Sequence, residues 1–516
     1  MLTTLIAIPA LGAVFVALLP RGADALAKWT AFAVSLVVAA LTLVMALQFE
    51  ANGPRFQFSQ SYWWIQQFGV HWAVGVDGVA LVLIALSVIL VPVVVLASWT
   101  DADRSGAAEA TAEAPPPKRS VKTYFALLLS LEAMIIGVFA ATDLFLFYVF
   151  FEAMLVPVYF IIGSYGGPQR SYAAVKFLLY SLFGGLLMLA AVIALYVVSD
   201  ANSFLMSDLA KADLDVGAAR WLFLGFFIAF AIKAPLVPFH TWLPDAAGQA
   251  PAGALVLVVG VLDKVGTYGM LRFCLELFPE ASRWFTPVVL TLAVAGVVYG
   301  AILAIGQVDL KRLIAYTSIS HFGFIALGIF AMTSQGQSGA TLYMVNHGFS
   351  TGALFLIAGF MITRRGSARI DAYGGVQKVA PLLAGTFLIA GLSGLGLPGL
   401  SSFVSEFLVL VGTFTRYEVA AVIGTVGIIL AAVYILWMYQ RTMNGPTAEK
   451  VAAMPDLSRR EIVAVAPVVA IIVALGFFPQ PVLDVINPSV RQTLSRVQMQ
   501  DPQPTVATAV QQGEGP

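Results

Sequence analysis

The composition excludes a soluble protein. The chain has 516 residues, of which 59% are hydrophobic and 11% are charged. Soluble domains carry about 25% charged residues, so most of this surface cannot face water. The 28 basic and 28 acidic side chains cancel, which argues against a nucleic-acid partner, and the single cysteine, Cys274, excludes a disulfide framework or a metal site built from several cysteines. The composition therefore predicts a polytopic membrane protein.

Fourteen stretches are apolar and long enough to cross a bilayer as helices, which takes about 20 residues each. The first lies at the N-terminus, where an apolar start without basic residues favours a membrane span over a cleaved signal peptide. The predicted fold class is thus an all-α membrane protein of about fourteen transmembrane helices. The spans cover approximately residues 2–20, 27–47, 78–99, 123–141, 143–163, 171–198, 219–243, 252–277, 285–305, 309–330, 338–363, 380–415, 418–440 and 461–479.

Basic residues are divided unequally between the two ends of this predicted bundle. The loops after odd-numbered helices hold 17 of them, and the loops at the opposite end hold 7. Because basic loops remain on the cytoplasmic side, the count predicts that both termini lie outside the cytoplasm. The expected location is the inner (plasma) membrane.

Two of the predicted spans contain helix breakers. Gly394–Gly399 lies within residues 380–415, which as a straight helix would be about 52 Å long. Pro235 and Pro238 interrupt the seventh span. Broken helices at corresponding places in two halves indicate an ion path between internal repeats. Because five spans separate the breaks, we expect two inverted five-helix repeats, and the predicted parts are residues 1–122 (helices 1–3 and a cytoplasmic linker), 123–278 (first repeat), 285–441 (second repeat) and 442–516 (last helix and a polar tail).

Ionisable residues remain inside the spans after the loop charges are counted. A charge at the centre of a membrane helix costs about 2.5–3.5 kcal/mol on insertion scales, so a functional role is the default interpretation. The basic residues of this set are Lys176, Lys233, Lys264 and Arg272, and the acidic ones are Glu132, Glu152, Asp263, Glu276 and Glu406.

Glu152 and Lys233 are candidates for a proton switch. Glu152 lies near the centre of the fifth span, and Lys233 lies at the proline break of the seventh. Glu152 is either a hydrogen-bonding strut or the charged partner of a lysine. Because a nearby carboxylate favours the charged form of a buried amine, movement of such a partner would load or release a proton. Lys264, in the middle of the eighth span, is the second lysine to which this applies.

Two histidines lie between the lysines and Glu406. His321 and His347 occupy the adjacent tenth and eleventh spans, where they are either satisfied core residues or members of a proton relay. Glu406 lies inside the second half of the broken twelfth span, too far in for a simple cap.

The remaining ionisable residues have less specific interpretations. Lys176 is either a proton site or a structural counter-ion, and Glu132 is expected to orient a neighbouring helix. Asp263 lies on a different helix face from Lys264, so it is not expected to be its direct partner. The spacing of Arg272 and Glu276 predicts a local i, i+4 pair.

Two long motifs resemble the signatures of a known family. The segments AIKAPLVPFHTWLPDA (231–246) and DLKRLIAYTSISH (309–321) resemble the antiporter-like, proton-translocating membrane subunits of respiratory complex I, the NADH-quinone oxidoreductase. Together with Phe151-Glu152, Asn346-His347-Gly348 and residues 398–407, the resemblance covers about residues 75–445. Glu406 resembles the M-type branch, since the L and N types carry lysine there.

The resemblance implies a function and a set of site residues. It places Glu152, Lys233, Lys264 and Glu406 on the proton path, His321 and His347 among the connecting residues and Lys176 at an auxiliary position, with Glu132 and Asp263 as further candidates. It implies that this chain binds no cofactor or metal, and that NADH, FMN, iron–sulfur clusters and quinone belong to other subunits. The implied partners are the L- and N-type neighbours, lipids, protons and internal water.

The sequence departs from the family pattern at two places. Ala247 and Gln249 replace the histidine and the acidic residue that usually follow the seventh span. This sequence therefore lacks the family's titratable residues for proton entry from the cytoplasmic side. Asp263 replaces a neutral residue and is expected to alter the proton affinity of Lys264. A subunit of a multi-subunit cation/proton antiporter is the alternative function. A structural membrane scaffold is a more distant one, which the number of buried charges disfavours.

Overall fold

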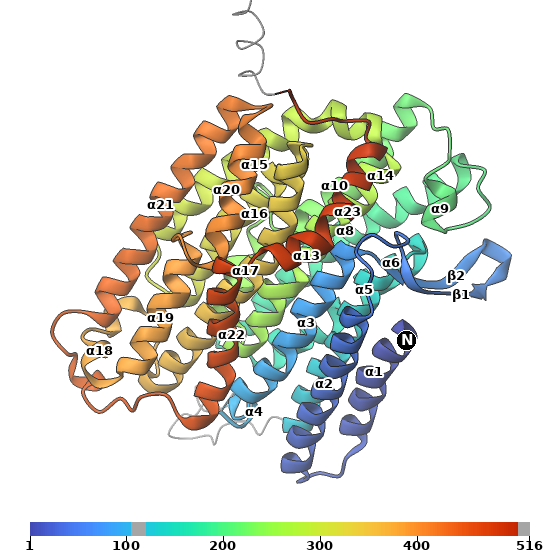
Figure 1. The fold of residues 1–516 in the computed structure, drawn as a ribbon. Coiled ribbons are helices and arrows are strands. Elements are labelled where there is room, and N and C mark those ends of the chain that lie inside the picture. Colours follow the sequence, from blue (N-terminus) through green and yellow to red (C-terminus); the bar gives the residue numbers. More distant parts are fainter. Residues whose placement is uncertain (105–119, 504–516) are drawn as a thin grey trace, which may run out of the picture.

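The computed structural model describes residues 1–104 and 120–503, so most of the predicted cytoplasmic linker lies outside the described residues. Long helices lie side by side and form one bundle (Figure 1). The helices of the first half are α1 (Leu2–Leu18), α2 (Asp24–Leu47), α3 (Gly78–Ala97), α4 (Asp101–Arg104), α5 (Val121–Ala140), α6 (Leu144–Ala153), α7 (Leu155–Tyr165), α8 (Arg170–Val198), α9 (Met206–Leu209), α10 (Val216–Lys233), α11 (Trp242–Gln249), α12 (Ala252–Leu257), α13 (Lys264–Gly269) and α14 (Leu275–Leu277).

The second half continues the bundle. Its helices are α15 (Pro279–Ile305), α16 (Leu310–Phe330), α17 (Ser334–Arg365), α18 (Val376–Val379), α19 (Pro381–Gly394), α20 (Ser401–Phe414), α21 (Glu418–Met443), α22 (Arg459–Phe477) and α23 (Gln480–Arg496). Short 3-10 helices are η1 (Gln66–Phe68), η5 (Ile370–Ala372) and η6 (Glu449–Val451).

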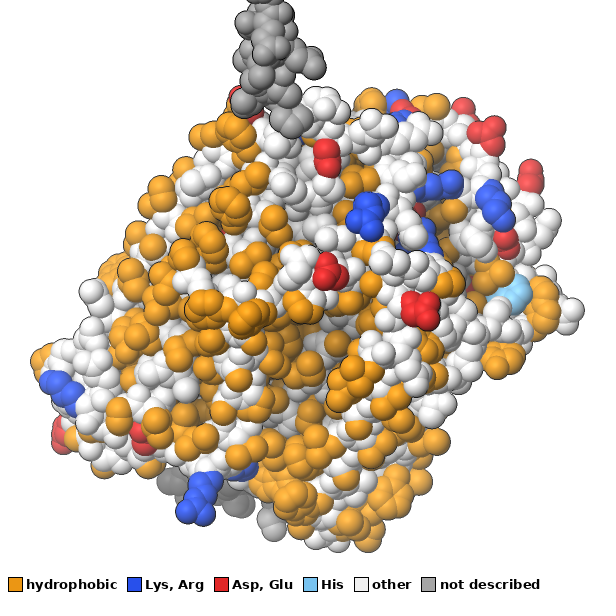
Figure 2. All heavy atoms as spheres, in the orientation of Figure 1, with side chains coloured by type: hydrophobic (Ala, Val, Ile, Leu, Met, Phe, Trp, Pro, Cys, Tyr) orange, Lys and Arg blue, Asp and Glu red, His pale blue; other side chains and the backbone are white. Residues whose placement is uncertain are grey.

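Within the described residues, twelve helical stretches are long and apolar enough to cross a membrane. Helix α1 has 17 residues, and α19 and α20 have 14 each, which is shorter than a full span. The predicted helical membrane fold is confirmed, whereas the count of fourteen spans stays a prediction. Hydrophobic side chains cover a broad band of the surface, and most charged side chains lie outside it (Figure 2).

The helices that carry most candidate residues lie in the interior. The stretch from α12 to α14 is completely buried, and α16 and α17 are almost completely buried, whereas α2, α8, α21 and α22 expose apolar faces. An aromatic cluster fills the space between α6, α10 and the eighth span, and its rings belong to Phe147, Phe151, Phe226, Phe230 and Phe273. The polar candidates are therefore enclosed by protein and kept away from lipid.

One segment outside the predicted spans contains β-strands. The residues between α2 and α3 contain a two-stranded antiparallel hairpin, with β1 (Gln57–Ile65) and β2 (Val70–Val76). Gly69 closes the turn with a φ of 69°, a conformation that glycine adopts without strain. The Trp72 indole donates to Thr3 Oγ1, which ties the hairpin to α1. Figure 1 shows the hairpin projecting from the side of the bundle.

The predicted polar tail contains a further helix, α23. Its buried residues are Ile486, Ser489, Val490, Thr493 and Leu494, and their three- and four-residue spacing makes one face of an amphipathic helix. Helix α23 packs against α3 and α17. It runs across the transmembrane helices instead of along them (Figure 1). The polar face explains why a membrane-span criterion missed this helix.

Both predicted helix breaks are present. The seventh span ends as α10 at Lys233 and resumes as α11 at Trp242, and the twelfth is divided into α19 and α20. Gly396 and Gly399 have φ values of 75° and 90° within the second break, where a side chain would be strained.

Two further irregularities were not predicted. The fifth span is interrupted at Met154, between α6 and α7, just before Pro157, whose ring cannot be accommodated in a regular helix interior. The eighth span contains two π-helical segments, η3 (Val258–Leu262) and η4 (Met270–Cys274). Such segments are rare and are frequently found at functional sites.

Candidate functional site

Lys264 is the first member of a row of buried polar side chains that ends at Glu406. It lies in the irregular eighth span. It is the first residue of α13, immediately after η3 and Asp263, and its side chain is completely buried. Its Nζ donates to the Val259 carbonyl in the same span and lies 2.6 Å from Nδ1 of His347 on α17. The Phe322 ring lies 5.1 Å from the same amine.

The row continues from His347 to Glu406. The rings of His347 and His321 are 5.3 Å apart between centroids. The hydroxyl of Tyr343 is hydrogen-bonded to Nδ1 of His321 and donates to Oε1 of Glu406. All four side chains are buried. The structure thus brings together four of the residues singled out in the sequence, Lys264, His347, His321 and Glu406, and adds Tyr343 as the link.

Tyr343 was missed because a tyrosine in an apolar span carries no charge to draw attention. Its spacing from His347 is the signal that could have found it. Residues four apart on a helix share one face, and both lie on α17. A polar face made of Tyr343, Asn346 and His347 follows from this spacing, and the Asn346 amide donates to the Ser401 carbonyl at the second helix break.

The break between α19 and α20 fits closely around Glu406. This glutamate is the sixth residue of α20, and a methyl group added to Gly396 would overlap its carboxylate. The glycine therefore allows the interrupted backbone to approach the acidic group. The position supports the expectation that Glu406 is more than a cap of the half-helix.

Glu152 and Lys233 are near each other without making an ion pair. Glu152 lies at the end of α6, is half-buried, and faces α8 so closely that a methyl group on Gly185 would overlap its carboxylate. The Lys233 amine lies 4.7 Å from the centre of the neighbouring Phe151 ring. The two charges influence each other through space, but the described part of the chain holds no Glu152–Lys233 contact within 4 Å. The predicted direct ion pair between Glu152 and Lys233 is therefore wrong for this structure, in which the two side chains are separated.

Asp263 is an acidic residue that both lysines influence. Its carboxylate is completely buried, and its charge acts on both Lys264 and Lys233. Among the described residues neither of its oxygens has a hydrogen-bonding partner. Buried polar atoms in proteins are normally satisfied by protein or by ordered water. An ordered water molecule would satisfy these oxygens.

Lys176 and Glu132 lie outside the row. The Lys176 amine is 2.7 Å from Oδ2 of Asp245, whose Oδ1 is 2.7 Å from Arg312. Of the two interpretations of Lys176, this geometry matches the structural counter-ion. Glu132 is completely buried on α5, and neither carboxylate oxygen has a hydrogen-bonding partner within the described ranges.

A second charged cluster lies where α23 meets the eighth span. Arg272 is 3.6 Å from Glu276, as its i, i+4 spacing predicts, but its closer partner is Asp77 at 2.6 Å. Asp77 caps α3 by accepting from the amide of Ala80. Burial favours the neutral carboxyl, but the guanidinium of Arg272 outweighs this effect, so the pKa of Asp77 is lowered. Thr493 on α23 completes the cluster by donating to Glu276.

Comparison with known proteins identifies the family. The sequence model described as "NADH:quinone oxidoreductase/Mrp antiporter, TM" matches residues 141–431, which is more than half of the chain. The chain belongs to this family. The match includes both helix breaks and every residue of the row from Lys264 to Glu406.

Individual members of this family are similar over almost the full chain. NADH-quinone oxidoreductase subunit M of Mycobacterium tuberculosis (strain ATCC 25618 / H37Rv) is 52% identical over 536 residues, covering 99% of this chain and 96% of the relative. The protein of the same name from Rhodobacter capsulatus is 40% identical over 499 residues, covering 94% of each chain.

Two solved structures share the fold. A chain of respiratory complex I from Thermus thermophilus superposes with a TM-score of 0.86 at 32% identity, over 96% of this chain and 100% of the other. A chain of the Mrp complex from Dietzia sp. DQ12-45-1b gives a TM-score of 0.83 at 21% identity, over 96% and 99%. At that lower identity the second likeness shows the fold alone.

Proposed function

We propose that the chain is the M-type, proton-translocating subunit in the membrane arm of an NADH-quinone oxidoreductase. The single observation that carries the proposal is the row of buried titratable groups from Lys264 to Glu406, which lies inside a membrane-spanning bundle. Such groups are expensive to insert and mark ion or proton paths. The relatives at 52% and 40% identity support the choice of complex.

In the proposed mechanism, a proton enters the row at Lys264 and leaves it at Glu406. The Lys264 ammonium passes a proton to Nδ1 of His347, and His321 receives it in turn. Tyr343 then relays by giving its own hydroxyl proton to Glu406 while it accepts one from His321. Each step is a transfer between groups that are in hydrogen-bond contact, except between the two histidine rings, where an intervening water molecule would bridge.

Glu152 and Lys233 would control the loading of this row. The Glu152 carboxylate is half-buried, unlike the other acids of the site, so a neighbouring subunit can act on it from outside the chain. When the carboxylate approaches Lys233, it stabilises the charged amine, and when it moves away, the proton is released towards Asp263 and Lys264. Chemical energy released elsewhere in the complex would reach this chain as such a change of charge.

The proposal includes the surroundings of the chain. NADH, FMN, iron–sulfur clusters and quinone belong to other subunits, so this chain acts as a non-redox part of the enzyme. Its neighbours are the L- and N-type membrane subunits. It lies in the inner membrane with both termini outside the cytoplasm. A cation/proton antiporter subunit remains the alternative, because the description of the matching family model names both the oxidoreductase and the Mrp antiporter.

The Lys233→Ala variant tests the proposed function. The substitution removes a buried amine at a helix end without removing much apolar surface, so the complex should assemble. We expect quinone reduction to lose most of its coupled proton transport in membrane vesicles. Lys378→Ala, at an exposed position in α18, is the matched control. An assembled Lys233→Ala complex with the wild-type yield of protons per quinone would overturn the proposal.

A further inference from the structure

A polar cavity lies at one end of the bundle, away from the row between Lys264 and Glu406. It has a volume of about 240 Å³ and is bounded by the ends of α3, α7, α11, α12, α16, α17 and α22. Its polar lining includes Thr100, Asp101, Gln249, Lys311, Thr363, Arg460 and Glu461. A water molecule occupies about 30 Å³ in the liquid, so several fit. We call this cavity the Lys311 pocket.

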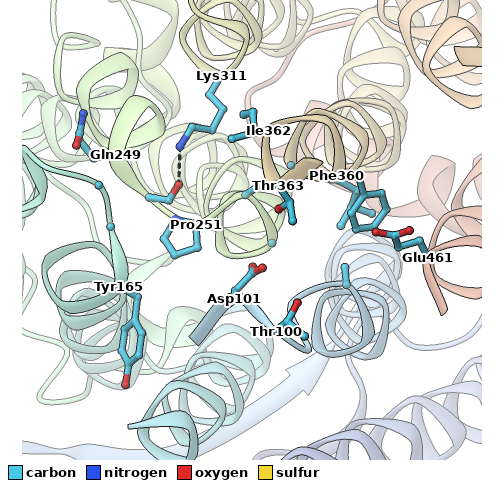
Figure 3. Close-up of a pocket in the computed structure, with 18 of the residues that line it drawn as sticks. Thr100, Asp101, Tyr165, Gln249, Pro251, Lys311, Phe360, Ile362, Thr363 and Glu461 are labelled. Carbon is cyan, nitrogen blue, oxygen red and sulfur yellow. Dashed lines mark hydrogen bonds between the residues drawn. The ribbon is translucent and has the colours of Figure 1, made fainter. Parts of the chain in front are cut away.

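Lys311 is the buried base of this pocket. Its amine donates to the carbonyl of Ala250, 2.9 Å away, and the side chain is 9% exposed. Figure 3 shows Lys311 and Asp101 on opposite sides of Pro251, with Lys311 reaching down to this carbonyl. Asp309 and Asp101 are the carboxylates whose charges act on the ammonium group. Glu461 is already paired with Arg364 at 2.6 Å.

Gln249, one of the two sequence departures after the seventh span, lines this pocket. The amide oxygen of Gln249 accepts from the backbone of Gln169 and caps the start of α8. An amide in this role does not titrate, and Ala247 is a buried methyl group. Lys311 is therefore placed to supply, from another helix, the titratable group that position 249 lacks.

The pocket and Lys264 belong to the same pair of packed helices. Ala250 and Pro251 lead directly into α12, and Lys264 follows Ala252 by about 18 Å of helix rise. Along this length α17 packs through glycines, since methyl groups on Gly352 and Gly359 would contact Val256 and Ala252. The Lys311 amine reaches the Ala250 carbonyl at one end of this length, and Lys264 and His347 lie at the other end.

We propose that the Lys311 pocket is a proton-loading site, in which the neutral Lys311 amine takes a proton from a hydronium ion at the membrane face onto which the pocket opens. An N–H bond forms at Nζ as an O–H bond of the hydronium ion breaks, which leaves water. Asp101 stabilises the resulting ammonium, and the proton passes inward towards Lys264. This proposal rests on the proposed function and names its point of proton uptake.

The Lys311→Arg variant of the assembled complex tests this site. Arginine keeps the positive charge and the ability to donate to Ala250, but it does not release its proton in proteins. In inverted membrane vesicles we expect the variant to lose as much of the proton yield per quinone as Lys233→Ala does. Lys378→Arg, exposed at the same end of the predicted topology, should keep the wild-type yield.

A second variant covers the case in which Lys311→Arg does not assemble. In a Thr363→Cys complex, a bulky membrane-impermeant maleimide would occlude the pocket, so labelling should lower the proton yield of the same preparation. Labelled Lys378→Cys is the control. An unchanged yield in assembled Lys311→Arg or in labelled Thr363→Cys would overturn the loading site. If Lys233→Ala alone loses pumping, the loading site fails while the proposed function stands.

Discussion

The hydroxyl of Tyr343 lies between His321 and Glu406 and is hydrogen-bonded to both. The two groups that it joins, Nδ1 of His321 and Oε1 of Glu406, are 3.8 Å apart. That distance is too long for a direct hydrogen bond between them. The link therefore joins a helix of the bundle interior to the half-helix after the second break. An uncharged side chain completes the row of titratable groups.

Tyr343→Phe removes this link and leaves the ring in place. We expect the complex to assemble and to lose most of the proton yield per quinone that depends on this chain, because His321 no longer reaches Glu406. Tyr434→Phe is the matched control, since Tyr434 is equally buried but its hydroxyl makes no hydrogen bond within the described residues. Equal proton yields for both variants would show that the Tyr343 hydroxyl has only a packing role.

Glu152→Gln separates the charge of Glu152 from its shape. The amide fits against Gly185 as the acid does, so a hydrogen-bonding strut should survive the change. If the charge controls Lys233, the amide should be as damaging to proton transport as Glu152→Ala, and Glu152→Asp should retain part of the activity. Proton transport in vesicles, normalised to quinone reduction, makes the comparison. A Gln variant as active as the wild type would rule out the switch.

Asp77→Asn tests the charged cluster that attaches α23. Asparagine can still cap α3, but Arg272 loses its closest counter-charge, and breaking a buried ion pair costs about 3–5 kcal/mol. We expect the assembled complex to dissociate at a lower temperature, as followed on native gels. Asp371→Asn, on an exposed surface ion pair, should have little effect.

The same cluster predicts the direction of an acid effect. Because the folded chain lowers the pKa of Asp77, its ionised form stabilises the fold above the ordinary aspartate range. This contribution is lost as the pH falls through the lowered pKa. The Asn variant should therefore lack this part of the acid-induced loss of stability. An identical pH profile in both proteins would contradict the assigned ion pair.

Much of the bundle could be predicted because the membrane imposes simple rules. Length and apolarity located the spans, and Gly394–Gly399 and Pro235 located the two breaks. The hairpin from Gln57 to Val76 and the amphipathic helix α23 follow other periodicities, so a search for apolar stretches of twenty residues could not find them. The π-helical turns before Lys264 depend on tertiary packing against α17, which leaves no local mark in the sequence.

The site was predictable to the extent that it is charged. The cost of burying Lys264 and Glu406 singled them out, and the histidines in the adjacent tenth and eleventh spans indicated a path between them. The separation of Glu152 from Lys233 was not predictable, because it depends on the interruption at Met154 and on which side chain of the pair Phe151-Glu152 faces α10. Asp77 escaped notice because its partner, Arg272, is distant in sequence.

The proton yield of Glu406 variants tests the central claim most directly. Glu406→Gln keeps the shape of the side chain but cannot bind and release a proton, whereas Glu406→Lys keeps a titratable group of the kind used in L- and N-type relatives. The measurement is the number of protons pumped per quinone reduced, with assembly verified by native gel. The account predicts measurable pumping in the Lys variant and nearly complete loss of this chain's contribution in the Gln variant. Pumping by Glu406→Gln at the wild-type yield would contradict it and would place the exit elsewhere.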